Sequence, residues 1–74
     1  MEIKEFIEKF AEAIEVENVG ALTAETEFRG LDEWSSLSVL LLIAFYDEEF
    51  EKELTQTQIK ASNTIQDLYN LAIA

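Results

Sequence analysis

The sequence contains no cysteine and no histidine. Disulfide bonds, thiolate nucleophiles, Cys/His zinc sites and imidazole acid–base catalysis are therefore excluded. Basic residues are scarce as well, because 5 Lys and Arg stand against 16 Asp and Glu and leave a net charge of −11. This charge disfavours nucleic acids and anionic lipid surfaces as partners and favours basic protein surfaces.

Long hydrophobic segments are also missing. The first residues lack the positive and apolar regions of a signal peptide. The apolar run from Val39 to Tyr46 is far shorter than the roughly 20 residues of a membrane-spanning helix. No repeat or low-complexity linker divides the chain, so we expect a single domain, residues 1–74, in a soluble cytoplasmic protein that does not bind membranes.

Apolar residues recur at helical spacing in three segments. They predict an amphipathic helix from Glu2 to Val16, a central helix from Ser36 to about Glu51, and a C-terminal helix that Asn63 opens as N-cap. Residues 51–61 are expected to form a loop with one short helical turn at 57–60. No segment has a clear strand pattern. The sequence thus predicts an all-α fold, a small bundle of three main helices plus one short helix.

The connection at residues 21–30 has no helical period and precedes the central helix. Leu22 and Phe28 are its two apolar side chains, and we expect them to anchor it to the core and keep it ordered. Gly30 can supply an unusual backbone angle directly before the central segment. Asn18 and Gly20 are expected to mark the end of the first helix.

Small polar side chains gather at the start of the central helix. Asp32, Ser35 and Ser36 can each accept hydrogen bonds from the free N–H groups of the first helical turn. Catalysis by Ser36 has no support, because the sequence places no base beside it, and we expect the protein not to be an enzyme. Calcium suits the many carboxylates, but no calcium-loop motif is present, so no structured metal site is expected.

The serine and its surroundings resemble the acyl carrier protein family over nearly the whole chain. In that family, a serine within Asp-Ser-Leu at the start of the second helix carries 4′-phosphopantetheine, and an acidic-acidic-Phe step ends that helix. Here Ser36-Leu37 is followed by Glu48-Glu49-Phe50, so that Phe50 lies 14 residues after the serine, as in the family. Trp34 and residues 61–68 are similar to stand-alone bacterial carriers with a Trp-Asp-Ser-Leu motif.

The resemblance implies an acyl-carrier-like four-helix bundle with 4′-phosphopantetheine, donated by coenzyme A, attached to Ser36. Such a protein holds acyl or aminoacyl groups as thioesters and presents them to partner enzymes. The implied partners are a phosphopantetheinyl transferase and acyl or aminoacyl ligases or synthases with basic docking surfaces, which a monomer visits in turn. The alternative is a carrier-like helical interaction module that is never modified.

The chain departs from the family at two places. Ser35 stands where the family has the Asp before the modified serine, which keeps the unmodified alternative open. Ser38 and Leu41 stand where typical carriers have acidic residues, so the partner-facing side is expected to be more apolar than is usual.

Partner-binding residues are predicted on the central helix, and they are Leu37, Leu41, Ala44, Asp47, Glu48 and Glu49. Each prediction has an alternative. Leu37 and Leu41 could belong to the core, Ser36 could be an ordinary N-cap, and Trp34 is more often a packing residue than a contact. The acidic residues could be a solvated helix end, but the helix dipole disfavours them there, so we predict that they steer basic partners.

Overall fold

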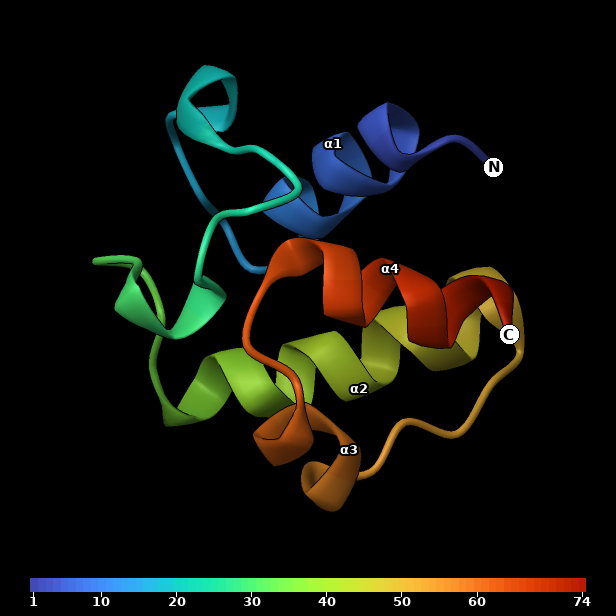
Figure 1. The fold of residues 1–74 in the computed structure, drawn as a ribbon. Helices are drawn as coiled ribbons and strands as arrows, with labels where there is room; N and C mark the ends of the chain where they lie inside the picture. The colour runs from blue at the N-terminus through green and yellow to red at the C-terminus, as the bar shows by residue number, and fades with distance from the viewer.

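The computed structural model describes all residues 1–74 and contains four α-helices joined by loops (Figure 1). They are α1 (Ile3–Ala13), α2 (Ser36–Phe50), α3 (Gln56–Ala61) and α4 (Ile65–Ile73). No strand is formed, and a single bridge joins Glu27 to Thr64. The prediction of a small all-α bundle with three main helices and one short one is confirmed. None of the helices combines the length and apolar character that crossing a membrane requires.

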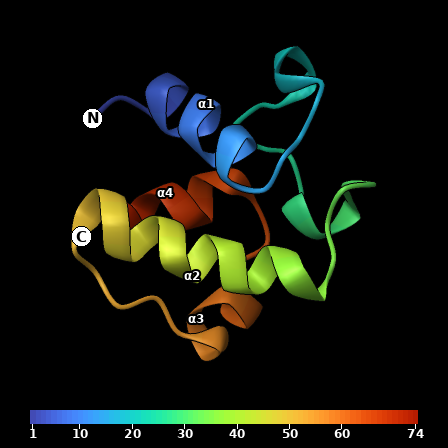
Figure 2. The same cartoon turned by 180° about the vertical axis from the view of Figure 1, so that it is seen from behind.

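The helices form layers that are recognisable from both sides of the molecule. In both views α2 and α4 lie in the middle, with α1 on one side of them and α3 on the other (Figures 1 and 2). The two chain termini lie together at the end of the bundle where α2 finishes. The start of α2 is therefore at the opposite end of the bundle.

The core is built around Phe6, which is fully buried on α1. Its ring centroid lies 5.6 to 6.2 Å from those of five other aromatic rings, on α1, α2 and α4: Phe10, Phe45, Tyr46, Phe50 and Tyr69. Aromatic pairs at these distances add to the free energy gained by burial. The Tyr46 hydroxyl donates a hydrogen bond to the Leu68 carbonyl, which ties α2 to α4, and burial raises the pKa of Tyr46.

In the connection between α1 and α2, the expected anchors Leu22 and Phe28 are both buried. Short 3₁₀ turns at Val19–Ala21 and Phe28–Gly30 lie within it. Arg29 fastens it to the other side of the bundle by donating to the Ile59 carbonyl and to Asn63 Oδ1, both at 2.9 Å. The loop therefore holds the start of α2 in a fixed position.

Two predicted helix ends are wrong. The last helix is capped by Thr64 and not by Asn63, since Thr64 Oγ1 accepts from the N–H of Asp67 at 3.2 Å. The Asp67 carboxylate accepts from the N–H groups of Asn63 and Thr64, and these bonds lower its pKa. The first helix ends at Ala13, before the expected stop, because Glu15 takes a left-handed conformation with φ of 60°.

The segment after α2 is more helical than expected. The predicted turn at 57–60 is the helix α3, which Thr55 opens. Thr55 Oγ1 accepts from the N–H of Gln58 at 3.1 Å, and Gln58 Oε1 accepts from the N–H of Thr55 at 3.0 Å. This reciprocal pair is a capping box, which stabilises the first turn of a helix that is too short to be stable alone.

Candidate functional site

Two of the three serines at the start of α2 secure the helix. Ser35 is the N-cap, with extended backbone angles (φ −147°, ψ 179°), and its N–H donates to Ser38 Oγ at 3.0 Å. Ser38 Oγ in turn donates to the Glu33 carbonyl at 3.1 Å, and Ser38 is only 2% exposed. Ser35 and Ser38 together form a capping box.

Ser36, the predicted attachment residue, is the first residue of α2 and is exposed. Its hydroxyl makes no hydrogen bond, since the side-chain bonds of this turn involve Ser35, Ser38 and Glu33. The alternative that Ser36 is an ordinary N-cap is wrong, because Ser35 caps the helix. An accessible hydroxyl remains at the positive end of the helix dipole.

The residues just before the serines are fixed by packing. The Trp34 ring lies edge-on to the ring of buried Phe28, with 5.0 Å between centroids. The backbone N–H of Trp34 donates to the Leu31 carbonyl at 3.0 Å. Trp34 is therefore a packing residue in this structure. Gly30 does not adopt a positive φ, and Asp32 does not cap the helix, so neither has the local role considered from sequence.

The outward side of α2, which we call the α2 face, presents exposed residues on successive turns: Ser36, Leu37, Leu40, Ala44, Asp47 and Glu48. Leu37 and Leu40 are each 59% exposed, so Leu37 is not a core residue. Leu41 lies at the edge of this face, half-buried against the core. Leu40 was missed from sequence, although its position four residues after Ser36 places it on the same side of the helix.

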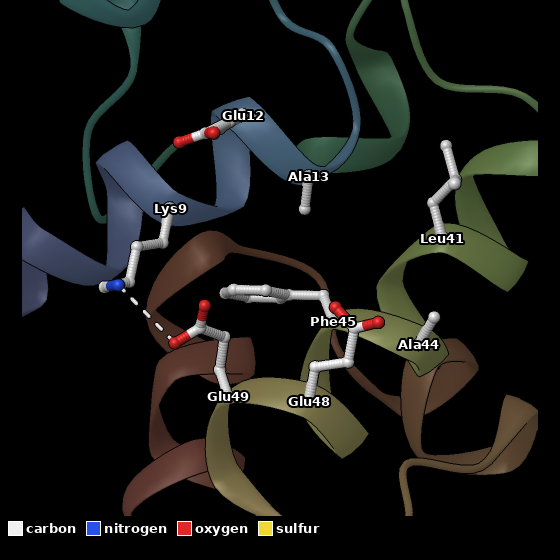
Figure 3. Close-up of a pocket in the computed structure, with 8 residues that line it drawn as sticks. All are labelled: Lys9, Glu12, Ala13, Leu41, Ala44, Phe45, Glu48 and Glu49. Carbon is white, nitrogen blue, oxygen red and sulfur yellow. Dashed lines mark hydrogen bonds and ion pairs between the residues drawn. The ribbon is translucent and has the colours of Figure 1, made fainter.

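A groove of about 390 Å³ lies beside the α2 face, between α1 and α2, and we call it the α1–α2 groove. Figure 3 shows its lining: Lys9, Glu12 and Ala13 from α1, and Leu41, Ala44, Phe45, Glu48 and Glu49 from α2. Four of the predicted partner-binding residues, Leu41, Ala44, Glu48 and Glu49, are thus brought together here. The other two, Leu37 and Asp47, lie outside its lining on the α2 face.

The acidic end of α2 is open to solvent. Asp47, Glu48 and Glu49 are all exposed, and of these only Glu49 forms an ion pair, with Lys9 at 3.4 Å between Nζ and Oε2. That pair is the single salt bridge of the molecule. Side chains of opposite charge on a partner can therefore approach these carboxylates without displacing other protein groups, apart from Lys9.

The chemical inventory of the site is one free hydroxyl, an apolar face and unpaired carboxylates. No three or more of the acidic side chains are grouped in a way that could hold a metal ion. The chain matches no protein-family model, no curated protein and no solved structure.

Proposed function

We propose that this chain is an acyl carrier protein whose Ser36 receives 4′-phosphopantetheine from coenzyme A and so carries acyl or aminoacyl groups as thioesters. The observation that carries the proposal is the difference between the three serines. Ser35 and Ser38 form the helix cap, whereas Ser36 is exposed and its hydroxyl is free. The separation of 14 residues between Ser36 and Phe50, shared with the acyl carrier protein family, supports the same assignment.

The modification would form a bond between Ser36 Oγ and the phosphorus of the phosphopantetheine. The serine proton is lost, the phosphoanhydride bond of coenzyme A breaks, and adenosine 3′,5′-bisphosphate leaves. We expect the transferase to supply the general base, because no side chain of this chain is hydrogen-bonded to the Ser36 hydroxyl. When attached, the arm supplies the thiol that holds the cargo, which is why the carrier needs no cysteine of its own.

The first turn of α2 suits a phosphodiester. Its free N–H groups and the positive end of the helix dipole attract an anion, and no acidic residue lies in that turn. With Asp in place of Ser35, as in the family, a carboxylate would stand directly before the phosphate. The departures at Ser35 and Ser38 leave the cap intact, and the one at Ser35 removes a carboxylate that the transferase reads in the family.

Mass spectrometry tests the proposal directly. The purified chain, incubated with coenzyme A and a broad-specificity phosphopantetheinyl transferase, should gain the mass of one phosphopantetheinyl group, and Ser36→Ala should gain none. Ser62→Ala is the matched control, because Ser62 is buried and its hydroxyl donates to the Gln58 carbonyl, so it is not available for attachment. The Ser62→Ala variant should therefore gain the same mass as the wild type. The absence of a mass gain on the wild type, or an equal gain on Ser36→Ala, rejects the proposal.

Partner enzymes with basic surfaces are expected to be steered by the acidic end of α2. Glu48→Gln with Glu49→Gln should slow association with the transferase and flatten its salt dependence, as followed by stopped-flow fluorescence. Glu25→Gln with Glu27→Gln changes the net charge equally, in exposed positions of the loop before α2, and should have a smaller effect. If only Leu41→Ala weakens binding, recognition is apolar and steering is wrong.

An unmodified interaction module is the second candidate. The exposed Leu37 and Leu40 favour it, because they offer an apolar contact surface whether or not Ser36 is modified. The mass measurement separates the two functions. In either role we infer a monomer that works in the cytoplasm and is not an enzyme.

A further inference from the structure

We propose that a second groove, between α1 and the connection that follows it, binds a free aliphatic amino acid such as leucine. We call it the α1–loop groove, and its volume is about 340 Å³. Four of its lining residues come from α1 and four from the connection: Ile3, Lys4, Ile7, Glu8, Val19, Gly20, Leu22 and Ala24. None of them belongs to the α2 face or to the α1–α2 groove, so the inference goes beyond the proposed carrier function and does not require Ser36 to be modified.

The walls of the α1–loop groove are aliphatic. Ile3 and Ile7 lie one turn apart on α1, and Val19 and Leu22 line the groove from the connection, which lies beside α1 in both overall views (Figures 1 and 2). Leu22 is part of the core, and Ile7 and Val19 pack against it, so these walls belong to the packed part of the molecule. Since no aromatic ring lines the groove, it suits an aliphatic side chain.

Two side chains of opposite charge line the same groove. Lys4 and Glu8 are both exposed, and neither forms an ion pair, because the single salt bridge of the molecule joins Lys9 to Glu49. Lys4 and Glu8 are four residues apart on α1, but a lysine that precedes a glutamate is the less favourable order for pairing along a helix. The groove therefore offers one ammonium group and one carboxylate to a ligand.

An amino acid zwitterion matches both charges. Its carboxylate can pair with Lys4, which lies in the first turn of α1, where the helix dipole also favours negative charge. Its ammonium group can pair with Glu8, while its aliphatic side chain covers the apolar walls. A fatty acid would pair with Lys4 alone, and the net charge of −11 would repel it, whereas a zwitterion has no net charge.

The size of the groove also favours a small ligand. Small-molecule sites typically have volumes of about 300–1,000 Å³, and about 340 Å³ is close to the lower limit. A ligand with few atoms gains little binding energy, so we expect a dissociation constant in the millimolar range.

Nuclear magnetic resonance titration with L-leucine tests this inference on the unmodified chain. At constant pH and ionic strength, L-leucine should cause saturable shifts of the methyl signals of Ile3, Ile7 and Val19. Glycine lacks the aliphatic side chain, isocaproate lacks the ammonium group and isoamylamine lacks the carboxylate, so each should bind more weakly than L-leucine. The proposal is overturned if any of the three binds as tightly, or if the shifts grow linearly up to the solubility of leucine.

Matched variants locate the binding. Lys4→Gln with Glu8→Gln removes both charges of the groove without changing the net charge, and it should weaken L-leucine binding about two- to thirtyfold, the range expected for losing two exposed ion pairs. Glu53→Gln with Lys60→Gln removes the same two charges at exposed positions outside the groove and should leave the affinity unchanged. Circular dichroism verifies that both variants fold. Equal weakening by both pairs, or a change of less than twofold in the groove variant, rejects the site.

Discussion

At the start of α2, three hydroxyl groups within four residues have different roles, and the backbone decides which is which. The extended conformation of Ser35 makes it the N-cap and places Ser36 as the first helical residue. Propensity could not make this distinction, because all three side chains are good cap acceptors. The spacing to Phe50 predicted Ser36 as the functional residue, and the structure leaves its hydroxyl accessible.

Substitutions at Ser35 should separate stability from modification. Ser35→Asp keeps an N-cap acceptor and restores the family carboxylate, so the free energy of unfolding should change by less than about 0.5 kcal/mol and modification should become faster. Ser35→Ala removes the cap acceptor and should cost about 0.5–2 kcal/mol. Urea unfolding and the initial rate of mass gain measure the two effects. If Ser35→Asp is not modified faster, the missing carboxylate does not limit recognition by the transferase.

Asp67 should make the free energy of unfolding depend on pH in the acidic range. Hydrogen bonds from the N–H groups of Asn63 and Thr64 lower its pKa in the folded state, so ionised Asp67 stabilises the fold above the ordinary pKa of 3.8. This contribution is lost as the pH falls through the lowered pKa. The wild type should therefore exceed Asp67→Asn in free energy of unfolding at neutral pH, and the difference should shrink on acidification. A difference that does not vary with pH would contradict this assignment.

Among the elements, helices were easier to predict than their ends. Periodic apolar residues identify α1, α2 and α4, because the buried face of a helix needs them whatever happens at its termini. The ends depend on single hydrogen bonds. The pairs Thr55 with Gln58 and Thr64 with Asp67 both have capping-box spacing, and this spacing marks the starts of α3 and α4 in the sequence.

The residue at the C-terminal end of α2 adopts a backbone conformation that is unfavourable for its residue type. Glu51 is the C-cap and adopts left-handed backbone angles (φ 53°, ψ 39°), where glycine avoids a steric cost of about 1–2 kcal/mol. Glu51→Gly should therefore raise the midpoint of urea unfolding. Glu51→Gln is the control, because it removes the charge near the negative end of the helix dipole and keeps the side chain. If the two variants are equally stabilised, charge and not backbone strain explains the gain.

The whole molecule has a large charge imbalance and one internal ion pair. With a net charge of −11 and a single salt bridge, repulsion among the carboxylates opposes the folded state, and dissolved ions screen it. Added sodium chloride or magnesium should therefore raise the melting temperature, by about 4–8 °C for each kcal/mol of repulsion relieved. A melting temperature that does not respond to either salt would exclude this source of instability.

The candidate site is predictable only in part, because part of it depends on how separate helices pack against each other. The residues on α2 follow from helical spacing, because they are all neighbours along one element. The α1–α2 groove depends on how α1 packs against α2, which brings Lys9 and Glu49 together although they are 40 residues apart in the chain. The pattern along a single helix contains no signal for that pairing.

The position of the termini has a practical consequence for measurement. Both ends of the chain lie where α2 finishes, with the Tyr69 hydroxyl bonded to the Met1 carbonyl and Lys52 to the Ala74 carbonyl, and the start of α2 is at the far end (Figures 1 and 2). A chain immobilised on a sensor surface through either terminus thus keeps Ser36 directed away from that surface. Enzymes flowing over the sensor can reach the hydroxyl, and either anchoring point should give the same modification rate.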